Sequence, residues 1–215
     1  MNEVQLIDKY LKRLTKKNNS SQDLNDDIFF DKSKRLAISI DTYVEKVHFP
    51  NFKTPDLIIK KVLRSSLSDL ICKGVKPKYY FLSASGNSKS FSKKNLKKIS
   101  SSLSSEQKKF DIKLSGGDTT KSKKLTFTIM SLGYSKRIIE RNKCKSGDDI
   151  FVTGNIGDSY LGLQILKKKI FLNKRKNDYF TKKYYLPNLP IQASSKLINI
   201  ATSSIDISDG LFGDL

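Results

Sequence analysis

The sequence predicts an α/β fold, of the mixed α+β kind, because helical and strand-like patterns alternate along most of the chain. Residues 55–73 carry apolar side chains at helical spacing, after Thr54, which can cap a helix, and before Gly74, which suits a left-handed C-terminal turn. Residues 35–44 alternate in polarity and are rich in β-branched side chains, which is typical of a strand. The 215 residues, 37% of them hydrophobic, are enough to bury a sizeable core.

The remaining elements follow from the same periodicities. Apolar spacing predicts further helices over residues 3–16, 92–109, 159–168 and 191–200, and further strands over 79–85, 112–115, 125–134 and 149–153. A polar loop is expected over 17–27, and a charged, aromatic helix-loop segment over 172–188. The charged stretch 135–145 and the turn at 146–148 indicate a boundary. We therefore expect an N-terminal domain over residues 1–146 and the beginning of a second α/β domain over 147–215, so that the chain is a fragment or is completed by a partner.

Composition limits the classes of function. The formal net charge is +20, mostly from lysines spread over the whole length, which indicates either a lysine-rich surface or a nucleic-acid partner. No helix-turn-helix, RNA-recognition or zinc pattern accompanies the charge, so the lysine-rich surface is favoured and only non-specific nucleic-acid binding is considered. No signal peptide or apolar run of roughly 18 residues is present, and Cys72 and Cys144 fit no disulfide framework. We therefore expect a cytoplasmic protein without membrane contact.

The most informative feature of the chain is the stretch 204–210, which puts Asp206 at the end of an expected strand and Asp209 on a glycine turn. Aspartates also recur in three other short segments where strands or helices are expected. Mg²⁺ prefers oxygen ligands and substrate phosphates, and carboxylates from several elements can hold such ions around a nucleotide. Each aspartate alone could be a cap, a turn or a surface residue, as we expect for Asp26 and Asp148. The joint pattern instead predicts a metal–nucleotide site formed by Asp27, Asp41, Asp69, Asp118, Asp206 and Asp209.

Three other features are candidate binding elements. Gly116-Gly117-Asp118-Thr119-Thr120 either brings backbone N–H groups close to a phosphate or forms a tight turn. His48, the single histidine, is either a general base or a partly buried side chain beside Phe49, and one histidine supports no catalytic triad. Arg141 could neutralise a phosphate or lie at the surface.

These segments, taken in order, resemble those of the thiamine-phosphate kinases, within the superfamily that includes aminoimidazole ribonucleotide synthetase, selenophosphate synthetase and the hydrogenase maturation dehydratase. The resemblance rests on residues 36–42 with 47–49, 67–70 with Gly74, 116–120, 152–159 and 204–210, and it covers nearly the whole chain. It implies an N-terminal mixed-sheet α/β domain of the aminoimidazole ribonucleotide synthetase type. It also implies a homodimer formed through that domain, with Mg²⁺ as cofactor and with ATP and thiamine phosphate as substrates.

The resemblance assigns roles to individual residues. It implies that Mg²⁺ is bound by Asp27, Ser39, Ile40 through its backbone, Asp41, Asp69, Asp118, Asp206 and Asp209. It implies ATP contacts from Gly117, Asp118, Arg141 and Ser208, and a thiamine phosphate contact from His48. No residue is assigned as a catalytic acid, base or nucleophile, because the implied reaction is a direct, metal-assisted phosphoryl transfer.

The chain departs from the family at residues 23–28. The family's glycine before the paired aspartates is here Asn25, and the bulky Ile28 replaces a small residue, although Asn also tolerates positive φ. The family also continues well beyond the Ser208-Asp209-Gly210 motif. Two alternatives follow: another ATP-dependent enzyme of the superfamily, or a truncated, non-catalytic protein with a basic, nucleic-acid-binding surface.

Overall fold

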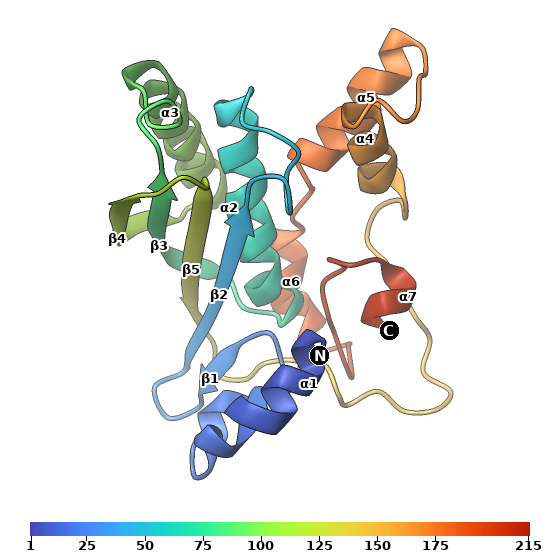
Figure 1. The fold of residues 1–215 in the computed structure, drawn as a ribbon. Coiled ribbons are helices and arrows are strands. Elements are labelled where there is room, and N and C mark those ends of the chain that lie inside the picture. The colour runs from blue at the N-terminus through green and yellow to red at the C-terminus, as the bar shows by residue number, and fades with distance from the viewer.

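A five-stranded mixed sheet forms the centre of the molecule (Figure 1). The computed structural model describes residues 1–215, the side chain of Glu3 excepted. The strands lie in the order β1-β2-β5-β3-β4, and all neighbours are antiparallel except β3 and β4. Their bounds are β1 Phe29–Asp31, β2 Leu36–Val44, β3 Pro77–Gly86, β4 Lys113–Lys121 and β5 Thr126–Tyr134. The mixed α/β fold predicted from the sequence is confirmed.

The helices are α2 and α3 in the N-terminal part and α4 to α7 in the C-terminal part. Their bounds are α2 Pro55–Cys72, α3 Lys93–Phe110, α4 Asp158–Leu166, α5 Lys174–Tyr185, α6 Ile191–Leu197 and α7 Leu211–Asp214. Over residues 3–16 the predicted single helix is instead a series of short turns: α1 Glu3–Leu6, a π-helical turn Ile7–Leu11 and a 3₁₀ turn Lys12–Thr15. Its apolar side chains Val4 and Leu14 are exposed, so little packing supports a regular helix there. Another 3₁₀ turn, Asn19–Leu24, lies within the predicted loop.

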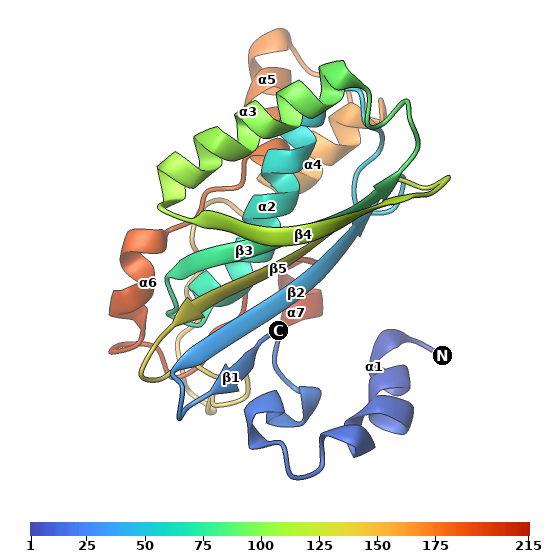
Figure 2. The same ribbon diagram turned by 90° about the vertical axis from the view of Figure 1, so that its left-hand side faces the viewer.

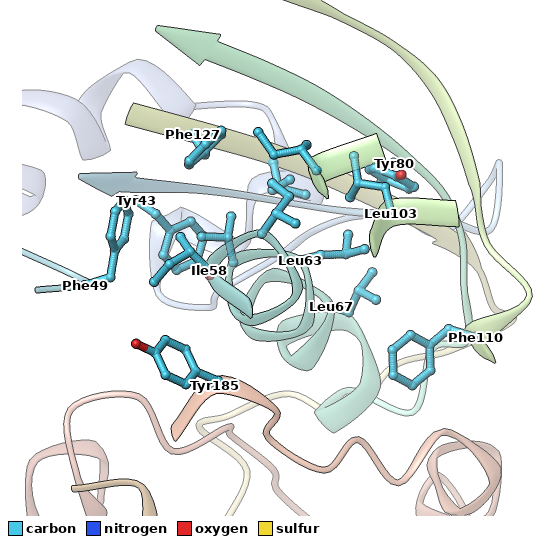
Figure 3. Packing of buried hydrophobic residues seen from close by; sticks show 14 of the residues in the cluster. Tyr43, Phe49, Ile58, Leu63, Leu67, Tyr80, Leu103, Phe110, Phe127 and Tyr185 are labelled. Atoms are coloured by element: carbon cyan, nitrogen blue, oxygen red, sulfur yellow. The ribbon is translucent and has the colours of Figure 1, made fainter. Parts of the chain in front are cut away.

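The helix α2 packs along the sheet and supplies most of the core. Its side chains Ile58, Ile59, Val62, Leu63 and Leu67 are fully buried, because their helical spacing puts them on the side that meets the sheet and α3. Figure 3 shows α2 at the centre of this cluster, with side chains from β2, β5, β3 and α3 around it. As predicted, Pro55 lies in the first turn and Gly74, at a φ of 79°, follows the end, but the Thr54 side chain makes no capping hydrogen bond.

The two faces of the sheet differ. Along β2, Ala37, Ser39 and Tyr43 are buried, and these alternate with the exposed Ile40 on the opposite face. In Figure 2 the strands β4, β3, β5 and β2 lie in front of α2, so α2 covers the far side of the sheet in this view. The side chains at odd-numbered positions of β2 therefore point toward α2, which is the geometry that creates the candidate site below.

The C-terminal part contains helices but no strand among its described residues 147–215, so the predicted strand over 149–153 is wrong. These residues have β-type side chains, but Ile150 and Phe151 are exposed and no neighbouring strand satisfies the backbone there. The helix α5 contacts α2, and its Tyr184 and Tyr185 join the main core. Among the described residues, no helix is both long and apolar enough to cross a membrane.

A buried ion pair connects α2, α3 and the segment after α5. Arg64 Nε and Nη2 donate to the carboxylate of Glu106 at 2.6 and 3.0 Å, and Nη1 donates to the Pro187 carbonyl oxygen at 3.1 Å. The side chains of Arg64 and Glu106 are 7% and 2% exposed. Such a pair holds the elements in one arrangement, and either charge left alone is costly.

We expect Glu106→Leu to lower the free energy of unfolding by about 3–5 kcal/mol, because it leaves the Arg64 charge buried and unpaired. The double variant Arg64→Met with Glu106→Leu should recover much of that loss, since it removes both charges. Chemical denaturation of the single and double variants measures both effects. A loss below about 1 kcal/mol for Glu106→Leu, the range of an exposed pair, would contradict this account of the fold.

Candidate active site

The candidate site begins where α2 crosses β2. Asp69, on α2, is 8% exposed. The Ser39 hydroxyl of β2 donates to Asp69 Oδ2 at 2.5 Å. Strand alternation puts Ser39 and Asp41 on the same side of β2, so both point toward α2. Two predicted site residues 30 positions apart along the chain are thus brought into contact.

Asp41 and Asp206 are held near Asp69 by hydroxyl groups. The Tyr43 hydroxyl donates to Asp41 Oδ2 at 3.0 Å. The Ser68 hydroxyl of α2 lies 2.6 Å from Asp206 Oδ2, and this contact links the C-terminal segment to α2. Contrary to the prediction, Asp206 does not end a strand, because residues 201–207 are irregular. Its position depends on the contact with α2 instead.

Removal from solvent is the largest cause that raises the pKa of all three carboxylates. Burial, and then the charges of Asp41 and Asp206, raise the pKa of Asp69 from its ordinary 3.8 to about 9. Burial also raises the pKa of Asp41, against the hydrogen bond from Tyr43. Burial raises the pKa of Asp206 as well, with contributions from the charges of Asp27 and Asp41. We call Asp41, Asp69 and Asp206 the carboxylate cluster. A bound cation would stabilise the ionised form of these three side chains.

Within the described residues, no three carboxylate, imidazole or thiol side chains lie close enough together to share one metal ion. The carboxylate cluster therefore forms no closed protein cage. Mg²⁺ commonly binds through one or two carboxylates and completes its shell with water and substrate phosphates. This donor set, oxygen only and open on one side, fits that preference.

A second acidic pair, Asp26 and Asp27, lies beside the cluster and already contacts two cations. Lys73 Nζ lies 2.7 Å from Asp26 Oδ1 and 3.5 Å from Asp27 Oδ2. Arg141 contributes its backbone N–H to Asp26 Oδ2 at 3.0 Å and its Nη1 to Asp27 Oδ1 at 3.2 Å. Asp27 Oδ2 is buried and accepts no hydrogen bond, but the ion pair with Lys73 compensates its charge. Arg141 is thus brought to the site by Asp26 and Asp27.

The structure does not bring Asp118 and Gly117 to the cluster. The segment expected to be a tight turn or a phosphate-binding loop lies inside the edge strand β4, whose residues are all exposed, so the tight-turn interpretation is wrong. A Cβ atom on Gly117 would lie 1.8 Å from the Leu82 carbonyl oxygen, so this glycine lets β4 approach β3. Asp118 lies three strand positions from β2, roughly 14 Å across the sheet.

Ser208 and Asp209 lie in an exposed turn near the cluster's C-terminal segment. Their backbone N–H groups, with that of Gly210, donate to the Asp214 carboxylate at 2.9 to 3.4 Å. Asp214 was not predicted to have a role. It holds this turn in shape, and the side chains of Ser208 and Asp209 remain exposed.

Two further predicted residues lie at β2. His48 is exposed; its Nδ1 accepts the Val44 N–H at 2.9 Å and its ring packs edge-on against Tyr43. The Ile40 side chain is 66% exposed on the sheet face away from α2. Its backbone remains within the strand, between Ser39 and Asp41.

Sequence reasoning missed Lys73, Tyr43 and Ser68 as site residues. Lys73 follows Asp69 by four residues, and this spacing on one helix face was the only signal. Ser68 lies within the segment 67–70, but the sequence assigns it no role, because only the folded structure brings it to Asp206.

Comparison with known proteins identifies the chain's relatives. The family model for the AIR synthase related protein, N-terminal domain, matches residues 25–135. Thiamine-monophosphate kinase of Buchnera aphidicola subsp. Schizaphis graminum is 40% identical over 226 residues, which cover 100% of this chain and 68% of the relative. The same enzyme of Buchnera aphidicola subsp. Acyrthosiphon pisum is 38% identical and is covered to 67%. The chain thus spans about two thirds of the length of these relatives.

Solved structures show the same similarity. Thiamine monophosphate kinase from Aquifex aeolicus superposes with a TM-score of 0.81 at 26% identity, over 98% of this chain and 70% of that one. AaThiL complexed with AMPPCP and TMP gives a TM-score of 0.85, also at 26% identity, over 100% of this chain and 70% of that one. The hydrogenase maturation protein HypE of E. coli, at 20% identity and a TM-score of 0.58, shares the fold.

The raised pKa of Asp69 gives a prediction for the metal-free protein. The folded state holds a proton that the unfolded chain releases near pH 4, so stability is lost as the pH rises from about 4 to about 9. We expect the Tm to fall between about pH 6 and about pH 9, and to fall less in Asp69→Asn, whose amide does not ionise. Calorimetry of both proteins in chelator measures this.

Asp111→Asn is the matched control, because Asp111 is exposed and its lysine neighbours lower its pKa. Its Tm should follow the unmodified protein over this range. An Asp69→Asn variant with the same pH dependence as the unmodified protein would contradict the assigned ionisation.

Proposed function

Because this chain belongs to the thiamine-monophosphate kinase family, we propose that it transfers the γ-phosphoryl group of ATP to thiamine phosphate, giving thiamine diphosphate and ADP. The observation that carries the proposal is the carboxylate cluster: the buried Asp69 of α2 and the half-buried Asp41 of β2 and Asp206 of the C-terminal segment, each hydrogen-bonded to a hydroxyl group. The AMPPCP and TMP bound by AaThiL support the same pair of substrates.

The acceptor in this reaction is itself a phosphate. Its second pKa is about 6, so it is largely ionised near neutral pH and needs no general base. This agrees with a site rich in aspartates, and with His48, whose Nδ1 already accepts a backbone hydrogen bond. The protein's task is to align the acceptor with the γ-phosphate and to neutralise the charge that both bring.

We propose that Asp41, Asp69 and Asp206, which do not lie close enough together for all three to share one ion, bind Mg²⁺ singly or in pairs, together with the Ser39 hydroxyl and the Ile40 carbonyl oxygen. Bound Mg²⁺ would screen the phosphate charges and orient the reacting groups in line. The resemblance also implies Asp27 as a metal ligand, but its carboxylate already lies beside the charges of Lys73 and Arg141. Asp118 and Asp209 complete the proposed set; because they lie apart from the cluster, we propose that they bind other ions.

We assign the nucleotide contacts to Gly117, Asp118, Arg141 and Ser208, and the thiamine phosphate contact to His48. The position of Arg141 supports this assignment best, since its side chain is 38% exposed and its Nη1 lies 3.2 Å from Asp27 Oδ1, beside the cluster. Exposure of His48 and of the turn at Ser208 leaves both accessible to a ligand.

We also propose that two copies associate through the sheet face that α2 does not cover. Ile40 is 66% exposed and Tyr134 is 57% exposed on that face, while the edge strand β4 is exposed along its length. Apolar side chains in such a position are better buried against a partner. The division into domains 1–146 and 147–215 remains part of this proposal.

Asp206→Asn should reduce Mg²⁺-dependent formation of thiamine diphosphate by more than about 100-fold, because even groups that only support a metal ligand matter by 10–100-fold. The 215-residue chain is assayed with ATP, thiamine phosphate and Mg²⁺, and product is quantified by chromatography. Asp111→Asn, the same change at an exposed lysine-paired aspartate, should retain activity. An Asp206→Asn variant with full turnover would rule out the assigned cluster, and an unmodified chain that forms no product would contradict the proposed activity.

A further inference from the structure

Lys73 is buried at the acidic end of the site. It follows the last residue of α2, and its side chain is 0% exposed. Its ammonium group lies 2.7 Å from Asp26 Oδ1 and 3.5 Å from Asp27 Oδ2, and it donates to the Ser204 carbonyl oxygen at 2.8 Å. A lysine is almost never fully buried unless its charge is paired, and here the pairing is to three oxygens from two separate segments.

The oxygens around Lys73 resemble the donor set of a divalent cation. Two carboxylates and a backbone carbonyl are the hard oxygen ligands that Mg²⁺ and Ca²⁺ use. Asp26 is 3% exposed, so its charge could not be left without a cation at this depth. The ammonium group therefore occupies the position that a metal ion would otherwise fill.

The charge is unevenly distributed between the two ends of the site. The Asp26 and Asp27 carboxylates face two cations, Lys73 and Arg141, so that end is already neutral. The carboxylate cluster has hydroxyl donors but no basic side chain within ion-pair distance among the described residues. A divalent cation therefore gains more at the cluster than at the Asp26 end.

We propose that Lys73 is a built-in cation that replaces one divalent ion at Asp26 and Asp27, so that metal binds this chain only through the remaining carboxylates. This rests on the proposed function, since it presumes a metal-dependent site. Lys73 is then a positioning residue: through the Ser204 carbonyl it also fixes the segment that leads to Asp206. On this proposal, the ion pairs with Lys73 and Arg141 hold the Asp27 carboxylate in place without a metal ion.

The number of Mn²⁺ ions bound per chain tests this directly, measured by equilibrium dialysis and by the electron paramagnetic resonance of free Mn²⁺. Asp27→Asn should bind as many ions as the unmodified chain, because Lys73 already neutralises the Asp27 carboxylate. Lys73→Met, which keeps the unbranched shape and removes the charge, should bind about one additional ion. That ion should be lost again when Asp27→Asn is added to Lys73→Met.

Lys76→Met is the matched control, since it removes the same charge from an exposed lysine paired with Asp111. It should leave the number of bound ions unchanged. The inference is overturned if Asp27→Asn loses an ion, or if folded Lys73→Met gains none. Where Lys73→Met does not fold, the comparison of Asp27→Asn with the unmodified chain decides alone.

Failure of the proposed function has a different signature. If the unmodified chain binds no Mn²⁺, or if Asp206→Asn binds as many ions as the unmodified chain, the carboxylate cluster is not a metal site. Lys73→Met would then still report on the Asp26 end by itself, because a gained ion there does not depend on the cluster.

Discussion

The structure depends on one electrostatic constraint: a buried carboxylate, Asp69, and two half-buried ones, Asp41 and Asp206, lie close together where α2 crosses β2. Asp69 is 8% exposed, and its pKa of about 9 reflects burial and the charges of its neighbours. Such an arrangement is unfavourable for folding alone, because each charge raises the cost of the next. Binding of a cation offsets this unfavourable free energy, and such carboxylate groups are typical of functional sites such as those of phosphoryl-transfer enzymes.

The fold supplies the means to hold these charges. The helix α2 packs its apolar side against the sheet, so that Ser68 and Asp69 meet Asp206 and Ser39 at fixed distances. Hydroxyl groups take the positions around the cluster, where they hydrogen-bond to a carboxylate in either protonation state. At the other end Lys73 and Arg141 supply positive charge from the protein itself. One side of the site is thus neutral before any ligand binds, and the other is left for metal and substrate.

The parts of this arrangement that follow from local pattern could be predicted from the sequence. The periodicity of residues 55–73 and the alternation around Asp41 determine α2 and β2, and these two elements position Asp41 and Asp69. Residues whose position depends on distant contacts could not be predicted. Gly117 has the pattern of a turn, yet its missing Cβ is needed for strand pairing with Leu82. Residues 149–153 have strand-like side chains, yet no strand pairs with them in the described structure, and Lys73 has no local signal beyond its spacing from Asp69.

The measurement that tests the central claim most directly is anomalous diffraction from crystals grown with Mn²⁺ and a non-hydrolysable ATP analogue. Mn²⁺ replaces Mg²⁺ at oxygen sites and its anomalous signal marks each ion. The account predicts Mn²⁺ between the Asp41, Asp69 and Asp206 carboxylates and the phosphates of the analogue. Nucleotide bound with no Mn²⁺ at these three aspartates would contradict it.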